Sequence, residues 1–195
     1  MEAKPNNCLD LWARSHYKSS IITFALTIQD ILVDPEQTVG IFSFSRATAQ
    51  TFLAQIKAEF ERNENLKVCF PDVLYWAPEK ESPRWSLQGG ILVKRRSNPK
   101  EATVEAWGLV DGNPTGRHFK ILMFDDMIEQ RNVSNPEQIA KATEACLAEI
   151  VDGAFTHDGH PAVARHMGNA RRRPYRDAVA IGKESPDSPR KIDAA

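Results

Sequence analysis

Two segments that lie far apart in the chain carry side chains suited to chemistry on a phosphate group. Residues 14–20 follow a short apolar run and include Lys18, which has a hydroxyl side chain directly after it. Residues 120–126 are mostly apolar and end in two adjacent aspartates. A lysine followed by serine or threonine is typical of a phosphate-binding loop, and aspartates at a strand end are typical Mg²⁺ ligands in nucleotide hydrolases. Together the two segments predict a nucleotide site.

The first segment lacks the glycines that let the backbone N–H groups of a standard phosphate-binding loop close around phosphate. Tyr17 stands directly before the lysine, and Trp12 stands at the start of the loop. Lys18 would contact the β- and γ-phosphates, Ser19 would ligate Mg²⁺, and the N-terminus of the following helix would attract the anion. A basic strand-to-helix turn with a serine cap is the alternative. The hypothesis names as cofactor-binding residues Arg14, Ser15, His16, Tyr17, Lys18, Ser19 and Ser20.

The second segment supplies the acidic side chains. In nucleotide hydrolases an aspartate at a strand tip holds Mg²⁺, and a neighbouring group orients the attacking water. This arrangement predicts Asp125 as the metal ligand and Asp126 as the catalytic base, with Glu129 as a second candidate for the base. A strand end with two solvated acids is the alternative interpretation.

The elements that must position these residues alternate between strands and helices. Apolar runs of strand length and periodic apolar stripes of helix length mark them. Strands are expected at residues 9–13, 38–44, 90–95, 103–107 and 119–124, and helices at 19–32, 48–63 and 136–150. This order predicts an α/β fold with a largely parallel sheet and flanking helices. Such a sheet binds ligands at the carboxyl ends of its strands, where both segments fall.

Two connecting segments carry further polar residues. Residues 108–118 contain three glycines and Arg117, which would sense phosphate or reach a partner; a plain connecting loop is the alternative. Residues 43–46 end the second predicted strand, where nucleotide-driven motors often place DNA-contacting or coupling residues. For them a helix cap is the favoured interpretation.

The composition is that of a soluble globular protein, with 42% hydrophobic and 26% charged residues. A net charge of −1 gives the whole chain no attraction for a polyanion. No apolar run approaches the roughly 20 residues that span a bilayer, and the first residues lack the apolar stretch of a signal peptide. We therefore expect a cytoplasmic protein with no membrane partner.

The composition changes after Gly153, where the chain becomes rich in charge and proline and carries a net positive charge. This change predicts two units, residues 1–146 and residues 147–195. Three consecutive arginines in the second unit would bind the phosphate backbone of DNA by releasing counterions, with a solvated helix end as the alternative. They are Arg171, Arg172 and Arg173.

Several of these segments resemble the large terminase subunit of tailed bacteriophages, the motor that packages DNA. Residues 11–23 resemble its deviant phosphate loop, in which arginine commonly replaces the first glycine. Further similarity lies in residues 98–108, 114–119 and 134–137, and in the strand that ends at Asp125 and Asp126. In the tail, residues 156–161, 169–173 and 183–195 resemble the end of the nuclease domain of the same family.

The resemblance implies a P-loop NTPase-like domain followed by a C-terminal fragment of an RNase H-like nuclease domain. It implies ATP and Mg²⁺ as cofactors, double-stranded DNA as the substrate, and the small terminase subunit and the portal as partners. It also implies the host cytoplasm as the location and allows a homo-oligomer. Asp193 would match the last metal-binding acid of the nuclease.

Members of this family are much longer than the 195 residues of this chain, so the resemblance implies an internal deletion. The coupling motif and the other nuclease acids are not visible. We therefore expect a partly retained nucleotide site and no nuclease activity, because one carboxylate cannot hold two metals. The alternative is a non-enzymatic prophage remnant that binds DNA or motor subunits through its basic C-terminal segment.

Overall fold

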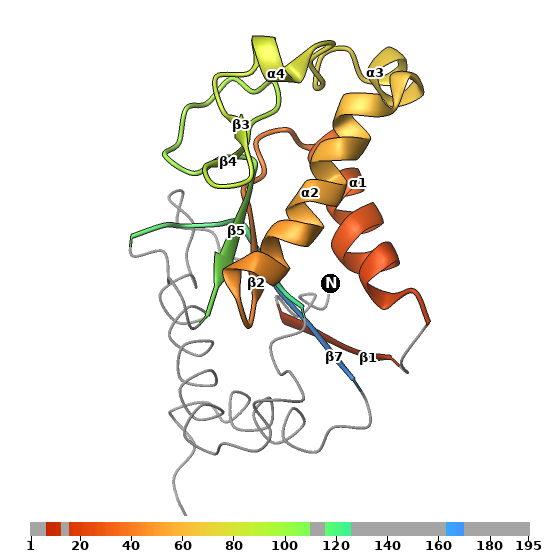
Figure 1. Ribbon diagram of the computed structural model, residues 1–195, viewed down its shortest axis with the longest axis vertical. Coiled ribbons are helices and arrows are strands. Elements are labelled where there is room, and N and C mark those ends of the chain that lie inside the picture. Colours follow the sequence, from red (N-terminus) through yellow and green to blue (C-terminus); the bar gives the residue numbers. More distant parts are fainter. Residues whose placement is uncertain (1–6, 13–15, 110–115, 126–162, 170–195) are drawn as a thin grey trace, which may run out of the picture.

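The computed structural model describes residues 7–12, 16–109, 116–125 and 163–169. These residues form one sheet whose described helices pack mainly on one face (Figure 1). The helices are η1 (Ser19–Leu26), α1 (Thr27–Val33), α2 (Arg46–Arg62), α3 (Glu64–Cys69) and α4 (Pro78–Glu81). The strands are β1 (Asn7–Trp12), β2 (Val39–Ser43), β3 (Trp85–Ser86), β4 (Gly90–Ile91), β5 (Val104–Gly108), β6 (Ile121–Phe124) and β7 (Val163–Asn169).

The sheet has seven strands in the order β1-β7-β6-β2-β5-β4-β3. The neighbouring pairs from β1 to β5 are all parallel, whereas β4 and β3 join the β5 edge as antiparallel strands. Because parallel strands run in one direction, their carboxyl ends share one edge of the sheet. Residues that follow β1, β2 and β6 therefore lie at a common edge. The mixed α/β class with a largely parallel sheet is confirmed.

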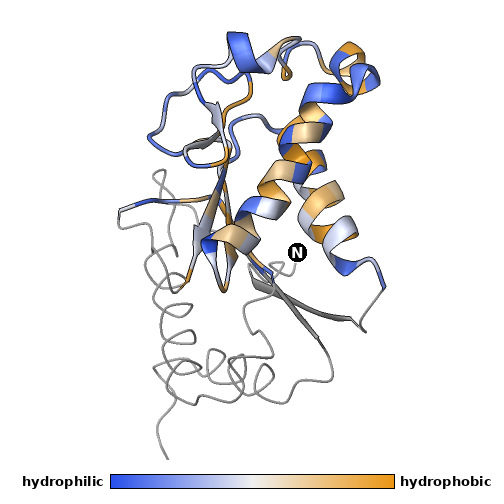
Figure 2. Cartoon of the chain, in the orientation of Figure 1, coloured by the Kyte–Doolittle hydropathy of each residue, from blue (hydrophilic) through white to orange (hydrophobic). Residues whose placement is uncertain are grey.

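The main core lies between the sheet and the helices that cover one of its faces. Alternate residues of the central strands, such as Val39 and Ile41 on β2, meet Leu53, Ile56 and Phe60 of α2 in this core. Hydrophobic residues run along α1, α2 and the central strands, while the loops near α4 are largely hydrophilic (Figure 2). This is the pattern expected where an amphipathic helix covers a buried sheet.

Aromatic rings cluster on the opposite face of the central strands. Phe42 stacks on Phe124 with 5.2 Å between the ring centroids, and Phe119 meets Phe42 edge to face. A Cβ atom at Gly40 would lie 2.7 Å from the Phe119 ring, so this strand position has no room for a larger residue. The central strands are thus buried on both faces, as their continuous apolar runs predict.

Most of the expected elements are present, with small shifts at their ends. The expected helix at 19–32 divides into η1 and α1, the helix at 48–63 is α2, and three of the expected strands correspond to β1, β2 and β6. The expected strand pair exists as β4 and β5, although β5 makes its longer pairing with β2. The expected helix at 136–150 lies outside the described residues.

The strand β7 is the main element that the sequence did not predict. Its residues, Val-Ala-Arg-His-Met-Gly-Asn, form no continuous apolar run. They become a strand because they pair on both sides, with β1 and with β6, and strand formation depends strongly on such context. The sequence-based division at residues 146 and 147 assigned this segment to a separate unit, whereas the structure places it inside the same sheet as β1.

Within the described part of the chain, no helix has the length and apolar character needed to cross a membrane.

Candidate nucleotide-binding site

The first site residues follow β1 and lead into η1. Tyr17 adopts a φ of 54°, a left-handed conformation that residues other than glycine rarely adopt. Its side chain is 76% exposed, so burial of the ring does not explain this conformation. Tyr17 stands where a standard phosphate-binding loop has glycine, and glycine adopts positive φ without strain. The backbone therefore takes a conformation that suits glycine even though the residue is tyrosine.

Lys18 and Asp125 meet at the carboxyl edge of the sheet. The Nζ atom of Lys18 lies 2.8 Å from Oδ1 of Asp125. Lys18 follows β1 and Asp125 follows β6, and these strands are separated in the sheet only by β7. The backbone N–H of Asp125 donates to the carbonyl of Phe42 on β2, at 2.9 Å, so the main chain at the aspartate is fixed. The side chains that the sequence singled out in two distant segments form one ion pair.

Thr23 is a third member of this group and was not among the predicted site residues. Its Oγ1 atom donates to Oδ2 of Asp125 at 2.8 Å, and both side chains are fully buried. The two carboxylate oxygens of Asp125 thus face different partners, Lys18 and Thr23. The strand alternation places Asp125 on the same face as Ile121 and Met123, which is the face covered by the helices.

The geometry of η1 explains how one helix supplies both partners. This helix is a π-helix over Ser19–Leu26, in which the backbone hydrogen bonds join residues five apart. Residues on neighbouring turns of a π-helix are therefore four or five positions apart, whereas in an α-helix they are three or four apart. Lys18 and Thr23 are separated by that π-helical interval. A hydroxyl five residues after the lysine is a signal that α-helical periodicity does not reveal.

A buried carboxylate such as Asp125 needs compensation for the water that it loses. Its side chain has no exposed surface, whereas the side chain of Lys18 keeps 15% of its surface exposed. Breaking a buried ion pair by removing one partner costs about 3–5 kcal/mol, because the other charge stays buried without compensation.

Only some of the remaining predicted residues of the first segment are described. Ser19 opens η1 and is partly buried, while His16 and Ser20 are exposed. Arg14 and Ser15 lie outside the described residues. The same is true of the predicted base candidates, the predicted nuclease metal ligand and the predicted DNA-binding arginines, which are Asp126, Glu129, Asp193, Arg171, Arg172 and Arg173. Their roles stay predictions.

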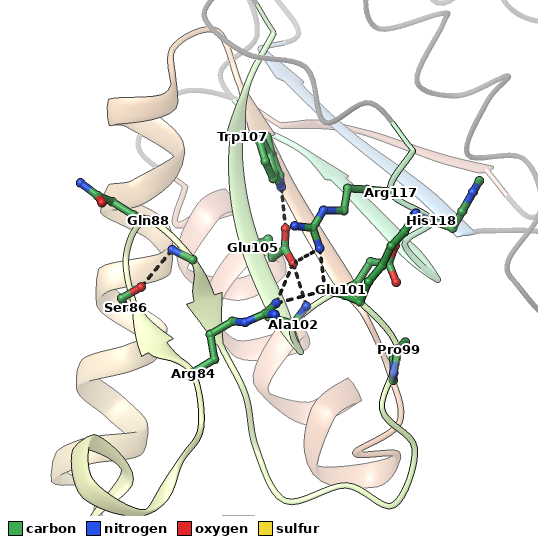
Figure 3. Close-up of polar contacts among 12 residues, drawn as sticks. Arg84, Ser86, Gln88, Pro99, Glu101, Ala102, Glu105, Trp107, Arg117 and His118 are labelled. Carbon is green, nitrogen blue, oxygen red and sulfur yellow. Dashed lines mark hydrogen bonds and ion pairs between the residues drawn. The ribbon is translucent and has the colours of Figure 1, made fainter.

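A second buried carboxylate, Glu105 on β5, is the centre of another polar cluster (Figure 3). Its Oε1 accepts the N–H of Ala102 at 2.7 Å and Nη1 of Arg117 at 3.2 Å. Its Oε2 accepts Nε1 of Trp107 at 3.1 Å. Nη1 of Arg84 lies 3.6 Å from Oε1. These contacts join β5, the loop before it, the segment leading to β3 and the segment leading to β6.

The contacts of Arg117 favour a structural role over phosphate sensing. The same guanidinium also donates to the carbonyl of Lys100 at 2.6 Å. Arg117 precedes the amino end of β6, whereas Asp125 follows its carboxyl end. The two residues therefore lie at opposite ends of one strand, and for Arg117 the described contacts support the connecting-loop interpretation.

The turn between β2 and α2 acts as a helix cap, as expected. The Oγ atom of Ser45 accepts the backbone N–H of Thr48 at 3.2 Å, which satisfies one of the free N–H groups at the start of the helix. The next residue, Arg46, donates to the carbonyl of Gln88 at 2.8 Å and lies over the ring of Trp107, 5.0 Å from its centroid. Arg46 thus joins α2 to its neighbours.

The comparisons with known proteins point to bacteriophages. The chain is 47% identical to the Gene 13 protein of Mycobacterium phage L5 and 30% identical to the Gene 13 protein of Mycobacterium phage D29. Each similarity covers 62% of this chain and 22% of the phage protein. The chain thus spans about a fifth of the length of the curated relatives that it matches. No protein-family profile and no solved structure matches it.

Proposed function

We propose that this chain is the nucleotide-binding part of a bacteriophage DNA-packaging motor of the terminase large subunit type, with a P-loop NTPase-like site for ATP and Mg²⁺. One observation carries the proposal: the Nζ of Lys18 lies 2.8 Å from Oδ1 of Asp125 at the carboxyl edge of the parallel sheet. A phosphate-binding lysine and a metal-binding aspartate must face one site, although these two residues are far apart in the sequence.

Each residue of the group has a role that matches its chemistry. Lys18 would bind the β- and γ-phosphates as a point charge. Asp125 and the hydroxyl of Ser19 would hold Mg²⁺, which prefers oxygen ligands and keeps several waters beside one or two carboxylates and the phosphates. In the described part of the chain, no group of three or more His, Cys, Asp or Glu side chains is placed to hold a metal. The few oxygen donors of the protein therefore suit a Mg²⁺ ion that the phosphates of the nucleotide also bind.

The particular motor is proposed from the resemblance of residues 11–23 and 114–126 to the terminase large subunit, together with the phage relatives. On this proposal Asp126 or Glu129 orients the attacking water, and Arg14 adds charge at the phosphates. Double-stranded DNA would contact Arg171, Arg172 and Arg173. The small terminase subunit, the portal and further copies of the chain are the proposed protein partners, in the cytoplasm of the host cell.

Titration of the protein with ATP in the presence of Mg²⁺ tests the proposal directly. We expect Lys18→Ala to weaken ATP binding roughly a hundredfold, because it removes a charge-assisted contact to phosphate. The matched control is Lys80→Ala, which removes an exposed lysine of α4 and is expected to leave the affinity unchanged. Thermal melting of both variants checks that they fold. Equal affinity of the wild type and Lys18→Ala would contradict the proposed site.

A further inference from the structure

The hydroxyl of Thr23 donates a hydrogen bond to Asp125, the metal-binding aspartate of the proposed site. Thr23 lies in the middle of η1 with no exposed surface. Its Oγ1 donates to Oδ2 of Asp125 at 2.8 Å, while Lys18 lies 2.8 Å from Oδ1. A hydrogen bond to one carboxylate oxygen limits rotation of the carboxyl plane. The other oxygen is thereby directed at Lys18.

The described backbone before and at Asp125 is held by the sheet. Its N–H is bonded to the carbonyl of Phe42 on the neighbouring strand, and the preceding residue, Phe124, is paired in the sheet. Thr23 is equally fixed, because η1 packs into the main core through Ile22 and the helix α1 that follows packs there through Ile28. The orientation of the carboxylate is therefore set by the hydroxyl that meets it. We therefore assign Thr23 no direct contact with a ligand, but an effect that acts through Asp125.

We propose that Thr23 is a positioning residue that keeps Lys18 and Asp125 paired in the nucleotide-free protein, so that nucleotide binds tightly only together with a divalent cation. This inference rests on the proposed function. Lys18 is available to phosphate only when it leaves Asp125, and Asp125 is available to a cation only when it leaves Lys18. Phosphate that takes Lys18 by itself leaves the buried charge of Asp125 without its counter-ion, which is costly. Both exchanges together leave each charge compensated.

The inference therefore predicts coupling between two ligands at one site. By linkage, a cation that raises the affinity for nucleotide is itself bound more tightly in the presence of nucleotide, by the same factor. The strength of the coupling depends on how firmly Asp125 is held. Removing the hydroxyl of Thr23 loosens the carboxylate, so nucleotide binding without the cation improves and binding with the cation weakens.

The test is ATP binding to the full chain by calorimetry, in Mg²⁺ and in EDTA, for the wild type, Thr23→Val and Thr23→Ser. Valine has the shape of threonine without the hydroxyl, whereas serine keeps the hydroxyl. We expect the ratio of the two affinities to be at least tenfold in the wild type. It should fall roughly tenfold in Thr23→Val, because a hydrogen bond to a charged group is lost, and it should be restored in Thr23→Ser.

A second variant and a second measurement keep the inference testable if Thr23→Val folds poorly. Asp125→Asn keeps an oxygen for Thr23 but removes the charge, so its nucleotide affinity in EDTA should rise above that of the wild type. Labelling of lysine amines without nucleotide, read by mass spectrometry, should show Lys18 protected in the wild type and more reactive in Asp125→Asn and Thr23→Val.

The outcomes separate the inference from the proposed function. If the wild type binds no ATP even with Mg²⁺, the proposed function is wrong and the inference is lost with it. If the wild type binds ATP equally well in Mg²⁺ and in EDTA, the proposed site survives and the inference is wrong. An unchanged ratio in folded Thr23→Val, or a ratio that Thr23→Ser does not restore, also overturns the role of Thr23.

Discussion

Two buried carboxylates of one sheet are held in different ways: Asp125 follows β6 and Glu105 lies on β5, with β2 between these strands. Asp125 has an ion pair with Lys18 and a hydrogen bond from Thr23. Glu105 accepts a backbone N–H and an indole N–H, and two arginines lie beside it. Lysine is a compact point charge on a flexible stem, whereas arginine is a planar fork that binds carboxylates in fixed geometry. Lysine therefore suits a site where it leaves Asp125 for a ligand, whereas the arginines suit a contact that holds Glu105 in a fixed arrangement.

Burial of an acid is therefore not sufficient evidence of a functional site. Both acids are buried, with 3% of Glu105 and none of Asp125 exposed, and both have cationic neighbours. The two acids differ in their position in the sheet. Asp125 follows the carboxyl end of β6, where a parallel sheet binds ligands, whereas Glu105 lies within β5 and joins segments of the fold to one another. Predictions that alter one acid and leave the other intact test this comparison.

The largest expected effect on stability comes from Glu105→Gln. The amide keeps the shape of the side chain but leaves Arg84 and Arg117 without a counter-charge and presents donors to existing donors. We expect the free energy of unfolding to fall by about 3 kcal/mol, measured by urea denaturation. Binding of ATP by the folded fraction should be unchanged. A loss of ATP affinity with full stability would reverse the roles assigned to the two acids.

A smaller effect is expected when a single cation is removed at each acid. Arg117→Ala leaves Glu105 with its other donors, so we expect a loss of about 1–2 kcal/mol in stability and no change in ATP affinity. Lys18→Met, which keeps much of the lysine volume, should lower ATP affinity instead. Urea denaturation gives the stability of both variants, and titration with ATP gives their affinities. The comparison fails if Arg117→Ala impairs ATP binding as much as Lys18→Met does.

The smallest expected effect comes from Trp107→Phe. Phenylalanine keeps most of the ring but removes the N–H that donates to Glu105 and weakens the stacking of Arg46. We expect a loss of about 1 kcal/mol in the free energy of unfolding, measured by chemical denaturation, with ATP affinity unaffected. A loss much greater than that of Arg117→Ala would mean that the aromatic contacts, rather than the charges, hold this cluster together.

Much of the sheet could be predicted because its strands carry local signals. The runs around β2 and β6 are apolar throughout, as strands buried on both faces must be, and α2 carries a periodic apolar stripe with a serine cap before it. Lys18 and Asp125 could also be singled out from the sequence, because lysine before a hydroxyl and aspartate after a strand are local patterns. Their functional roles stay proposals that the binding experiments address.

Other features of the site and of the fold could not be predicted from local patterns. Thr23 lies in a helix whose hydrogen-bonding pattern is π rather than α, so its position relative to Lys18 does not follow from ordinary helical periodicity. Glu105 lies in a strand as a charged residue among apolar ones, and its partners come from three other segments. The strand β7 carries a weak signal of its own and exists through its pairing with β1 and β6.

The sequence by itself determined the alternation of strands and helices and the residue types that a phosphate and a metal would need. Only the tertiary structure decided which of those residues meet. Thr23 and Asp125 are 102 positions apart in the chain and 2.8 Å apart in space. The physical reason is that hydrogen bonds across a parallel sheet gather the carboxyl ends of distant strands at one edge, and no local pattern records which strands will be neighbours.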